Sequence, residues 1–322
     1  MISINSQIIE NIFIDNKIDI DNLIISRRAS LSKFLISPLP IINLFIGKKK
    51  LNLNQINYLY YLHSNFEKIV RANSLELEKF KKAFDAIIPV NTMRMDSHKA
   101  FRNKLIDILG YKILRDNFYP DYFEKIGIRS CVYCNSQYAL TVRKVDGIKC
   151  AKFQIDHFLS KSDYPCFSIS FYNLYPVCGS CNNSKSTKTL KFKLYSDSFK
   201  DYNKSDFKFL LDKKSLLKYR VNGIDSELKI IFNDGISDFN NVLAVEGIYN
   251  TQKDIAEEIV LKSMIYNRAY TDSLRRSLEK LYHDKSPMIE RLLVGNYLDE
   301  KDIHKRPMAK FIQDIAKQLK LI

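Results

Sequence analysis

Four cysteines occur as two Cys-x-x-Cys pairs, Cys131/Cys134 and Cys178/Cys181, separated by residues 135–177. Such a turn brings two thiolates to one metal ion, and two turns complete a tetrahedral Zn²⁺ site without an open position. Disulfides are the alternative, but we expect no secretory signal, and a chain of 322 residues can bury a core without them. A redox-active Cys-x-x-Cys motif functions as a single copy, so the second copy argues against this alternative. The spacing therefore predicts one structural zinc ion.

Polar residues between and beside the cysteine pairs suit phosphodiester hydrolysis. Asp156 and His157 are adjacent, Asn173 precedes the second pair, and Asn182 follows it directly. A histidine near its ordinary pKa of about 6.5 can take a proton from water at neutral pH. A carboxylate and an amide oxygen can hold a hard cation such as Mg²⁺ or Mn²⁺. Either Asp156 or His157 alone would more simply be a hydrogen-bonded residue at a strand end, but the ordered set favours a catalytic site.

The segment that carries these residues is predicted to form two strands and a helix. Residues 138–145 and 148–155 have the composition of strands, and Asp146-Gly147 is typical of a hairpin turn between them. The second cysteine pair should then open a short helix that begins near Asn182. This order brings the polar groups together at one end of the unit.

The ordered set resembles the HNH family of endonucleases, the ββα-metal fold, in its four-cysteine zinc form. The resemblance implies that His157 is the general base, that Asp156 and Asn182 hold one divalent cation, and that Asn173 orients His157 through a backbone contact. Asn183 is an alternative ligand, or a residue that caps the helix. The matching residues are Cys131-x-x-Cys134, Asp156-His157, Asn173-Leu174 and Cys178-x-x-Cys181-Asn182-x-x-Lys185.

The sequence departs from the commonest HNH pattern shortly after His157. Ser160 stands where a proline is frequent, and the stretch from Lys161 to Pro165 replaces the usual glycine pair. That version is similar to the HNH partners of SMC-like ATPases in bacterial anti-phage systems such as the Septu type. The resemblance therefore implies an effector of anti-phage defence with an SMC-like ATPase as its partner.

The composition favours an anionic partner. The chain carries a net charge of +15, and residues 129–195 contain ten Lys or Arg against three Asp. Positive charge around a phosphodiester site fits a nucleic-acid substrate, although a lysine-rich solvated surface is the simpler interpretation of charge alone. We expect DNA to be bound, with contacts from four lysines: Lys161, Lys185, Lys188 and Lys191.

No stretch predicts a membrane span. Residues 34–46 are apolar, but they are too short and are interrupted by Pro38 and Pro40. A cytoplasmic location is the default expectation. Cys150 and Cys166 lie outside the paired motifs, and we expect each to be a buried free thiol.

We expect an α+β protein in which a zinc-stapled ββα-metal core is embedded in a mainly helical chain with a small accessory sheet. The predicted parts are a mainly helical N-terminal region (1–125), the core (126–195) and a C-terminal α+β region (196–322). Residues 1–50 have weak periodicity and could form an arm or a partner surface. The capping, breaker and periodicity signals predict helices at 54–72, 73–88, 97–110, 251–283 and from Pro307, and strands at 206–211, 216–221 and 227–232.

The function expected from the sequence is that of a metal-dependent HNH endonuclease, with structural Zn²⁺ and catalytic Mg²⁺ or Mn²⁺. Three alternatives remain open. The chain could be a zinc module that binds nucleic acid without catalysis, a ribonuclease that uses the same site, or an interaction scaffold in which the zinc core is only structural.

Overall fold

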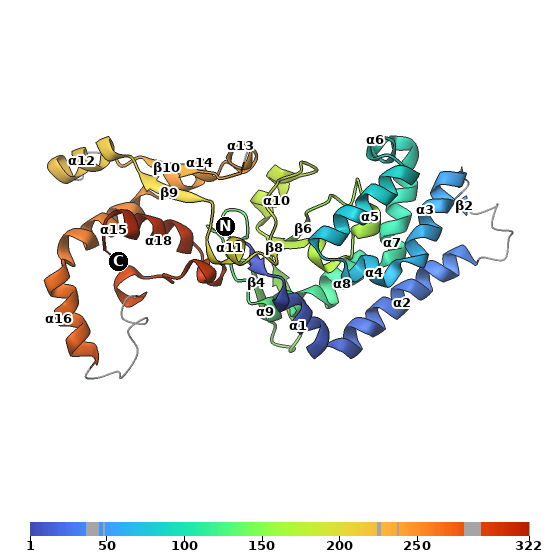
Figure 1. The fold of residues 1–322 in the computed structure, drawn as a ribbon, viewed down its shortest axis with the longest axis horizontal. Helices are drawn as coiled ribbons and strands as arrows, with labels where there is room; N and C mark the ends of the chain where they lie inside the picture. The colour runs from blue at the N-terminus through green and yellow to red at the C-terminus, as the bar shows by residue number, and fades with distance from the viewer. Residues whose placement is uncertain (37–44, 48, 224–226, 237, 280–290, 322) are drawn as a thin grey trace.

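Helices dominate the chain, and the strands pair only two at a time. The computed structural model describes residues 1–36, 45–47, 49–223, 227–236, 238–279 and 291–321. The molecule is elongated: the early helices lie at one end, the C-terminal elements lie at the other, and the cysteine-containing segment lies between them (Figure 1). The five sheets of the described residues have two strands each. The α+β class and the mainly helical character are therefore confirmed.

Local capping signals set several helix ends in the N-terminal part. Asn73 accepts hydrogen bonds from the backbone N–H groups of Leu75 and Glu76, and the Glu76 carboxylate accepts one from the Asn73 N–H in return. Gly110, with φ +72°, ends the helix before it. The helices here are α1 (Gln7–Asp15), α2 (Lys17–Leu35), α3 (Leu53–Ser64), α4 (Phe66–Arg71), α5 (Ser74–Ile87), α6 (Val90–Arg94), α7 (Lys99–Leu109), α8 (Tyr111–Asn117) and α9 (Tyr119–Ile126).

Two predicted helices in this part need correction. The helix expected over 54–72 is interrupted at Asn65, whose side-chain amide donates to the Tyr61 carbonyl and whose backbone leaves the helical region. Ser97 does not cap α7, because it lies in a 3₁₀ turn, Asp96–His98, that precedes the helix. Residues 1–36 pack onto the other helices: α1 packs against α9, and α2 packs against α7.

The C-terminal part contains one antiparallel strand pair, β9 (Lys208–Leu211) with β10 (Ile230–Asn233). The strand predicted at 216–221 is wrong, because those residues belong to helix α12 (Lys213–Asn222). Asp212 starts that helix by accepting a hydrogen bond from the Ser215 N–H. The remaining elements are α11 (Phe199–Asn203), α13 (Phe239–Leu243), α14 (Val245–Asn250), the 3₁₀ helix Glu300–Lys305 and α18 (Ala309–Gln318).

The long helix predicted over 251–283 is two helices. α15 (Lys253–Ile265) ends where Tyr266 adopts a non-helical conformation, and α16 (Arg268–Glu279) follows. The last four residues of the predicted helix lie outside the described residues. The accessory sheet is therefore confirmed as a single strand pair, whereas the adjoining helix is shorter than its periodicity indicated.

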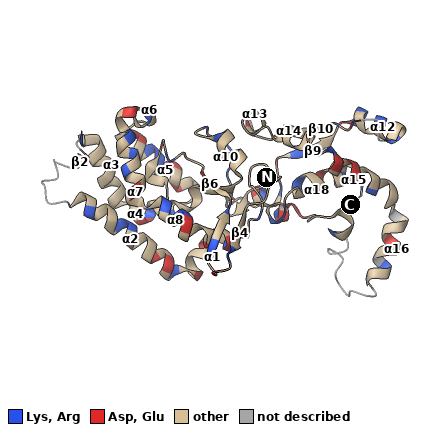
Figure 2. Cartoon of the chain, turned by 180° about the vertical axis from the view of Figure 1, so that it is seen from behind, with Lys and Arg blue, Asp and Glu red and all other residues tan. Residues whose placement is uncertain are grey.

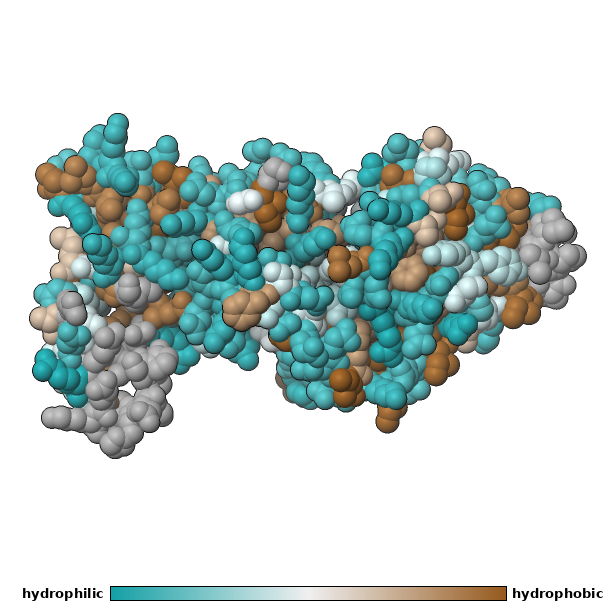
Figure 3. Space-filling model, viewed as in Figure 1, coloured by the Kyte–Doolittle hydropathy of each residue, from teal (hydrophilic) through white to brown (hydrophobic). Residues whose placement is uncertain are grey.

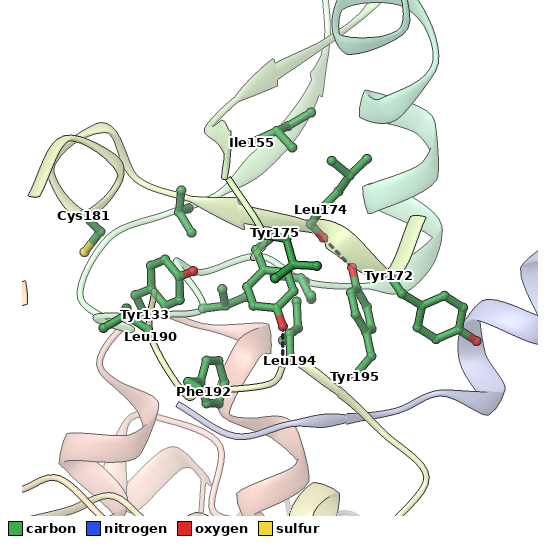
Figure 4. Close-up of a cluster of buried hydrophobic side chains, with 14 of the residues drawn as sticks. Tyr133, Ile155, Tyr172, Leu174, Tyr175, Cys181, Leu190, Phe192, Leu194 and Tyr195 are labelled. Atoms are coloured by element: carbon green, nitrogen blue, oxygen red, sulfur yellow. Dashed lines mark hydrogen bonds between the residues drawn. The ribbon is translucent and has the colours of Figure 1, made fainter. Parts of the chain in front are cut away.

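One buried apolar cluster runs through all three parts of the chain, from Met1 to Leu321. Figure 4 shows its centre, where tyrosines from different segments surround β7 (Leu174–Val177). The Tyr195 hydroxyl donates to the Leu174 carbonyl, and the Tyr175 hydroxyl accepts from the Leu194 N–H. These bonds fix β7 against the start of strand β8 (Tyr195–Ser196), which also pairs in parallel with strand β1 (Ile4–Asn5). The division at residues 125 and 195 stays a prediction.

Within the described ranges, no helix is both long and apolar enough to cross a bilayer. The apolar stretch predicted at 34–46 lies mostly outside those ranges. On the face shown in Figure 3, hydrophilic residues predominate and the apolar ones form small separate patches. Isolated apolar residues of this kind are ordinary on protein surfaces.

Candidate metal centre and active site

A hairpin precedes the Asp156-His157 pair, as predicted, but the pair does not lie on it. β4 (Leu140–Arg143) and β5 (Lys149–Lys152) are antiparallel, with Gly147 at φ +82° in the turn. The chain leaves the hairpin at Phe153, whose ring packs against Phe123. A separate strand, β6 (Gln154–His157), then pairs with β7. The predicted strand at 148–155 is therefore two strands, and the second one joins the segment that leads into Cys178.

Helix α10 (Gly179–Lys185) begins earlier than predicted, because Cys178 is its N-cap. The Cys178 sulfur accepts a hydrogen bond from the Cys181 N–H at 3.5 Å. A helix that begins here has Cys181 and Lys185 on its buried side, while Asn182 is partly exposed. The helix therefore connects one cysteine pair directly to the predicted catalytic residues.

The four cysteines of the two pairs form one buried cluster. Their sulfur atoms all lie within 4.8 Å of one another, and none is in a disulfide. The Cys134 and Cys178 sulfurs are 3.9 Å apart, close to the ~3.8 Å separation expected for tetrahedral Zn–S bonds of about 2.3 Å. The residues present fit a structural zinc ion, and the predicted four-cysteine cluster is confirmed.

The two remaining cysteines lie apart from the cluster. Cys166 is a buried free thiol that accepts a hydrogen bond from the Tyr58 hydroxyl, and burial raises its pKa. Cys150 is also free, but it is only half-buried on β5. Neither one is a fifth ligand candidate for the zinc.

The Asp156 carboxylate is bound by two side chains, one from each of the segments that carry the cysteine pairs. The Tyr133 hydroxyl, which lies between Cys131 and Cys134 in the sequence, donates to its carboxylate at 2.6 Å. The Lys185 ammonium, at the far end of α10, lies 3.0 Å from the same carboxylate. It also donates to the backbone carbonyl of His157 at 2.9 Å. Burial raises the pKa of Asp156, and the charge of Lys185 opposes that shift. One donor to Asp156, Tyr133, thus lies within the first cysteine pair, and the other, Lys185, lies on the helix that begins at the second pair.

His157 is buried as a neutral imidazole with a defined tautomer. Its Nε2 lies 3.0 Å from the Ser168 carbonyl, which can only accept, so Nε2 carries the proton and Nδ1 keeps the lone pair. The ring packs 4.9 Å from the ring of Tyr111, between centroids. Burial, with a smaller effect of Lys161, lowers the pKa of His157 to about 3. The ordinary value expected from the sequence does not apply to this ring.

Asn173 fixes the backbone around His157. Its side-chain oxygen accepts from the Leu159 N–H at 2.7 Å, and its amide donates to the carbonyls of Leu159 and Phe167. Its own carbonyl accepts from the N–H of Phe158. Phe167 precedes the residue whose carbonyl binds the His157 ring. Asn173 therefore supports the imidazole through two backbone segments and does not touch the ring in the described contacts.

Three of the four catalytic candidates, Asp156, His157 and Asn182, line one pocket of about 350 Å³, whereas Asn173 is fully buried and lies outside it. The Asn182 amide group donates to the Gln154 side chain at 2.7 Å, which leaves its oxygen available as a ligand. Both Asn182 and its neighbour Asn183 line this pocket, so either can supply an amide oxygen. The lining residues are Ile155, Asp156, His157, Ser160, Lys161, Ser162, Asn182, Asn183, Ser186 and Thr187.

The four lysines predicted to contact nucleic acid have different environments. Lys161 lines the pocket, whereas Lys188 and Lys191 are exposed beyond α10. Lys185 is wholly buried beside Asp156, and its contact with nucleic acid stays a prediction. Lys and Arg elsewhere occur along the whole molecule and not on one element (Figure 2).

Sequence reasoning overlooked the residues that support the site from other segments. Tyr133 had a recognisable position inside a cysteine pair, and a buried tyrosine needs a hydrogen-bond partner. Tyr111 and Ser168 carried no such signal, because their contacts with His157 depend on how α8 and the 168–170 turn pack. A sequence pattern therefore reveals the residues proposed to react more easily than it reveals the residues that hold them in place.

Replacement of Lys185 should show how much the buried ion pair stabilises this region. We expect Lys185→Met to lower the free energy of unfolding by about 3–5 kcal/mol, because it leaves the Asp156 carboxylate buried without its cation. Lys188→Met, which removes an exposed cation close in sequence, should change it by less than about 0.5 kcal/mol. Urea unfolding of both variants checks this difference. Equal stabilities would mean that Asp156 does not depend on Lys185.

Protein-family models, curated proteins and solved structures give no match to this chain. The resemblance to the HNH endonucleases therefore rests on the motif residues themselves, together with the buried four-cysteine cluster.

Proposed function

We propose that this chain is a metal-dependent endonuclease of the HNH type that hydrolyses phosphodiester bonds, with DNA as the favoured substrate. The observation that carries the proposal is the pocket beside the cysteine cluster. It brings together a neutral imidazole, a carboxylate and two amides. A zinc module that only binds nucleic acid would not need this set.

In the proposed mechanism, His157 is the general base. Its Nδ1 lone pair takes a proton from the attacking water, and the Ser168 carbonyl keeps the ring in the tautomer that this step needs. The resulting imidazolium donates through Nε2 to that carbonyl, so the bond that orients the base also stabilises its charged form. Asn173 holds the backbone that carries this carbonyl.

Asp156 and Asn182, with Asn183 as the alternative, would hold the divalent cation. When bound, Mg²⁺ or Mn²⁺ would neutralise charge on the phosphoryl group and on the leaving oxygen. A carboxylate has about four lone-pair sites, and Tyr133 and Lys185 each donate one hydrogen bond to it, so lone pairs remain for a metal ion. The donor set therefore fits a hard cation that keeps several water ligands.

The proposal includes a biological setting. The stretch from Lys161 to Pro165 supports a role as an effector in anti-phage defence with an SMC-like ATPase partner, through its similarity to Septu-type nucleases.

Cleavage assays on three substrates test the function. We expect the purified chain to cut plasmid DNA when Mg²⁺ or Mn²⁺ is added and to leave it intact without an added divalent cation. Single-stranded DNA and RNA are tested in parallel, with the zinc content measured in every sample. Cleavage of RNA alone would identify a ribonuclease. A zinc-loaded protein that binds nucleic acid but cuts none of the three would favour the non-catalytic alternative.

A further inference from the structure

Lys161 lies at the junction of two adjoining pockets. It lines the pocket that contains Asp156 and His157, and it also lines a second pocket of about 690 Å³. Ile155 and Asn182 are shared by both pockets as well. The two hollows are therefore continuous across these residues, and a ligand that occupies one of them can extend into the other.

The Lys161 side chain is half-buried and has no carboxylate within ion-pair distance among the described residues. Its ammonium lies 4.5 Å from the centroid of the Tyr111 ring, the same ring that packs against His157. Among the described residues, Lys161 makes no ion pair. Burial of an unpaired ammonium costs free energy, and a cation–π contact offsets only part of it. An anionic ligand would supply the missing charge, next to the catalytic histidine.

The second pocket is positively charged beyond Lys161. Its wall contains Arg115, Lys144 and Lys149, against one carboxylate, that of Asp116. Arg115 pairs with Asp116 at 2.9 Å, and Lys149 pairs with acidic residues of α9. Lys144 is exposed and makes no ion pair with a described residue. Two cations, Lys161 and Lys144, are thus left for a ligand in this hollow.

We propose that Lys161 binds the phosphate that is cut, and that the second pocket takes the next phosphate of the same strand against Lys144. The proposal rests on the proposed nuclease function. It gives the strand a direction, from the His157 pocket across Lys161 and along the β4–β5 hairpin. Lys188 and Lys191, two of the lysines expected to contact nucleic acid, line neither pocket, so this path does not include them.

Binding measurements separate this path from general charge attraction. In a His157→Ala background, a labelled DNA oligonucleotide is titrated over a range of salt concentrations. Lys161→Gln and Lys144→Gln should each weaken binding and reduce the salt slope by about 0.7–0.9, the value of one phosphate contact. Lys218→Gln is the matched control: it removes an exposed lysine from α12, at the distant end of the molecule (Figure 1). If the salt slopes of Lys161→Gln and Lys144→Gln equal that of Lys218→Gln, the proposed path is wrong.

Single-turnover cleavage distinguishes the two lysines. At saturating DNA, Lys161→Gln should cut about 10²-fold more slowly, because the charge that develops on the phosphoryl group loses a nearby cation. Lys144→Gln should keep the rate at saturation and need more DNA to reach it. Lys161→Gln should retain zinc and its melting temperature, since an unpaired buried charge is removed. A normal rate for Lys161→Gln would exclude its contact with the reacting phosphate.

The outcomes also separate this proposal from the nuclease function. If the wild type cuts no substrate but Lys161→Gln lowers the salt slope, the path stands and the catalytic proposal fails. If the wild type cuts DNA and both lysine variants match Lys218→Gln, the catalytic proposal stands and the path fails.

Discussion

His157→Ala should reduce DNA cleavage by about 10²–10⁴-fold, the usual contribution of a general base. The reason is structural: the Nδ1 lone pair is the part of the ring that the Ser168 carbonyl leaves free to accept a proton. Zinc content and DNA binding should be unchanged, because neither one uses the imidazole. Single-turnover cleavage at matched Mg²⁺, with binding measured in parallel, gives the result.

The substitution also removes a buried side chain, so its effect on folding needs a control. We expect a stability loss of about 1–3 kcal/mol, because the Ser168 carbonyl loses its donor in the interior. His63→Ala is the matched variant: His63 bonds to the Ser32 hydroxyl at 2.8 Å and lies outside the pocket. It should lose some stability but keep its cleavage rate. Near wild-type cleavage by folded His157→Ala would remove the proposed mechanism.

The pH dependence of cleavage tests the burial of this histidine. A general base works when deprotonated, so activity is lost as the pH falls through its pKa in the folded protein. Burial lowers that pKa to about 3, and titration of His157 should therefore cause no loss of kcat/KM between about pH 5.5 and 8. A loss centred near pH 6.5, the ordinary histidine value, would mean that the ring is less desolvated in solution than its burial in the structure implies.

Cys178→Ser should remove the zinc and with it the order of the site. The binding free energy of structural zinc in small domains is about 10–16 kcal/mol, which is comparable to the free energy of unfolding of a typical protein. Cys178 is both a ligand candidate and the N-cap of α10. Its loss should therefore free the helix that carries Asn182 and Lys185, and both melting temperature and cleavage should fall.

Metal analysis and thermal unfolding measure this effect directly. The wild type should contain one Zn²⁺ per chain, and Cys178→Ser should contain much less. Cys150→Ser changes a free, half-buried thiol outside the cluster and should keep its zinc and its melting temperature. Full zinc occupancy in a Cys131→Ser and Cys178→Ser double variant would exclude this set of ligands.

The sequence by itself determined the features that depend on neighbouring residues. The cysteine spacing predicted the buried four-sulfur cluster, Asn73 and Glu76 predicted a capping box, and Asp146-Gly147 predicted the hairpin turn. Each one is a local signal, because a cap or a turn is completed within a few residues. The residue pattern was a poorer guide than these local signals. It predicted a strand at 216–221, where the N-cap at Asp212 instead begins a helix.

Only the tertiary structure decided how the candidate site is held. Phe153 ends the hairpin because Phe123 of α9 packs against it, which frees β6 to pair with β7. Lys185 is buried because α10 points it at Asp156, and the His157 pKa falls because residues far away in the chain, such as Tyr111 of α8, bury most of the ring. Burial and electrostatics depend on groups far apart in the chain, so residue types and spacing identify the reacting groups but not their environment.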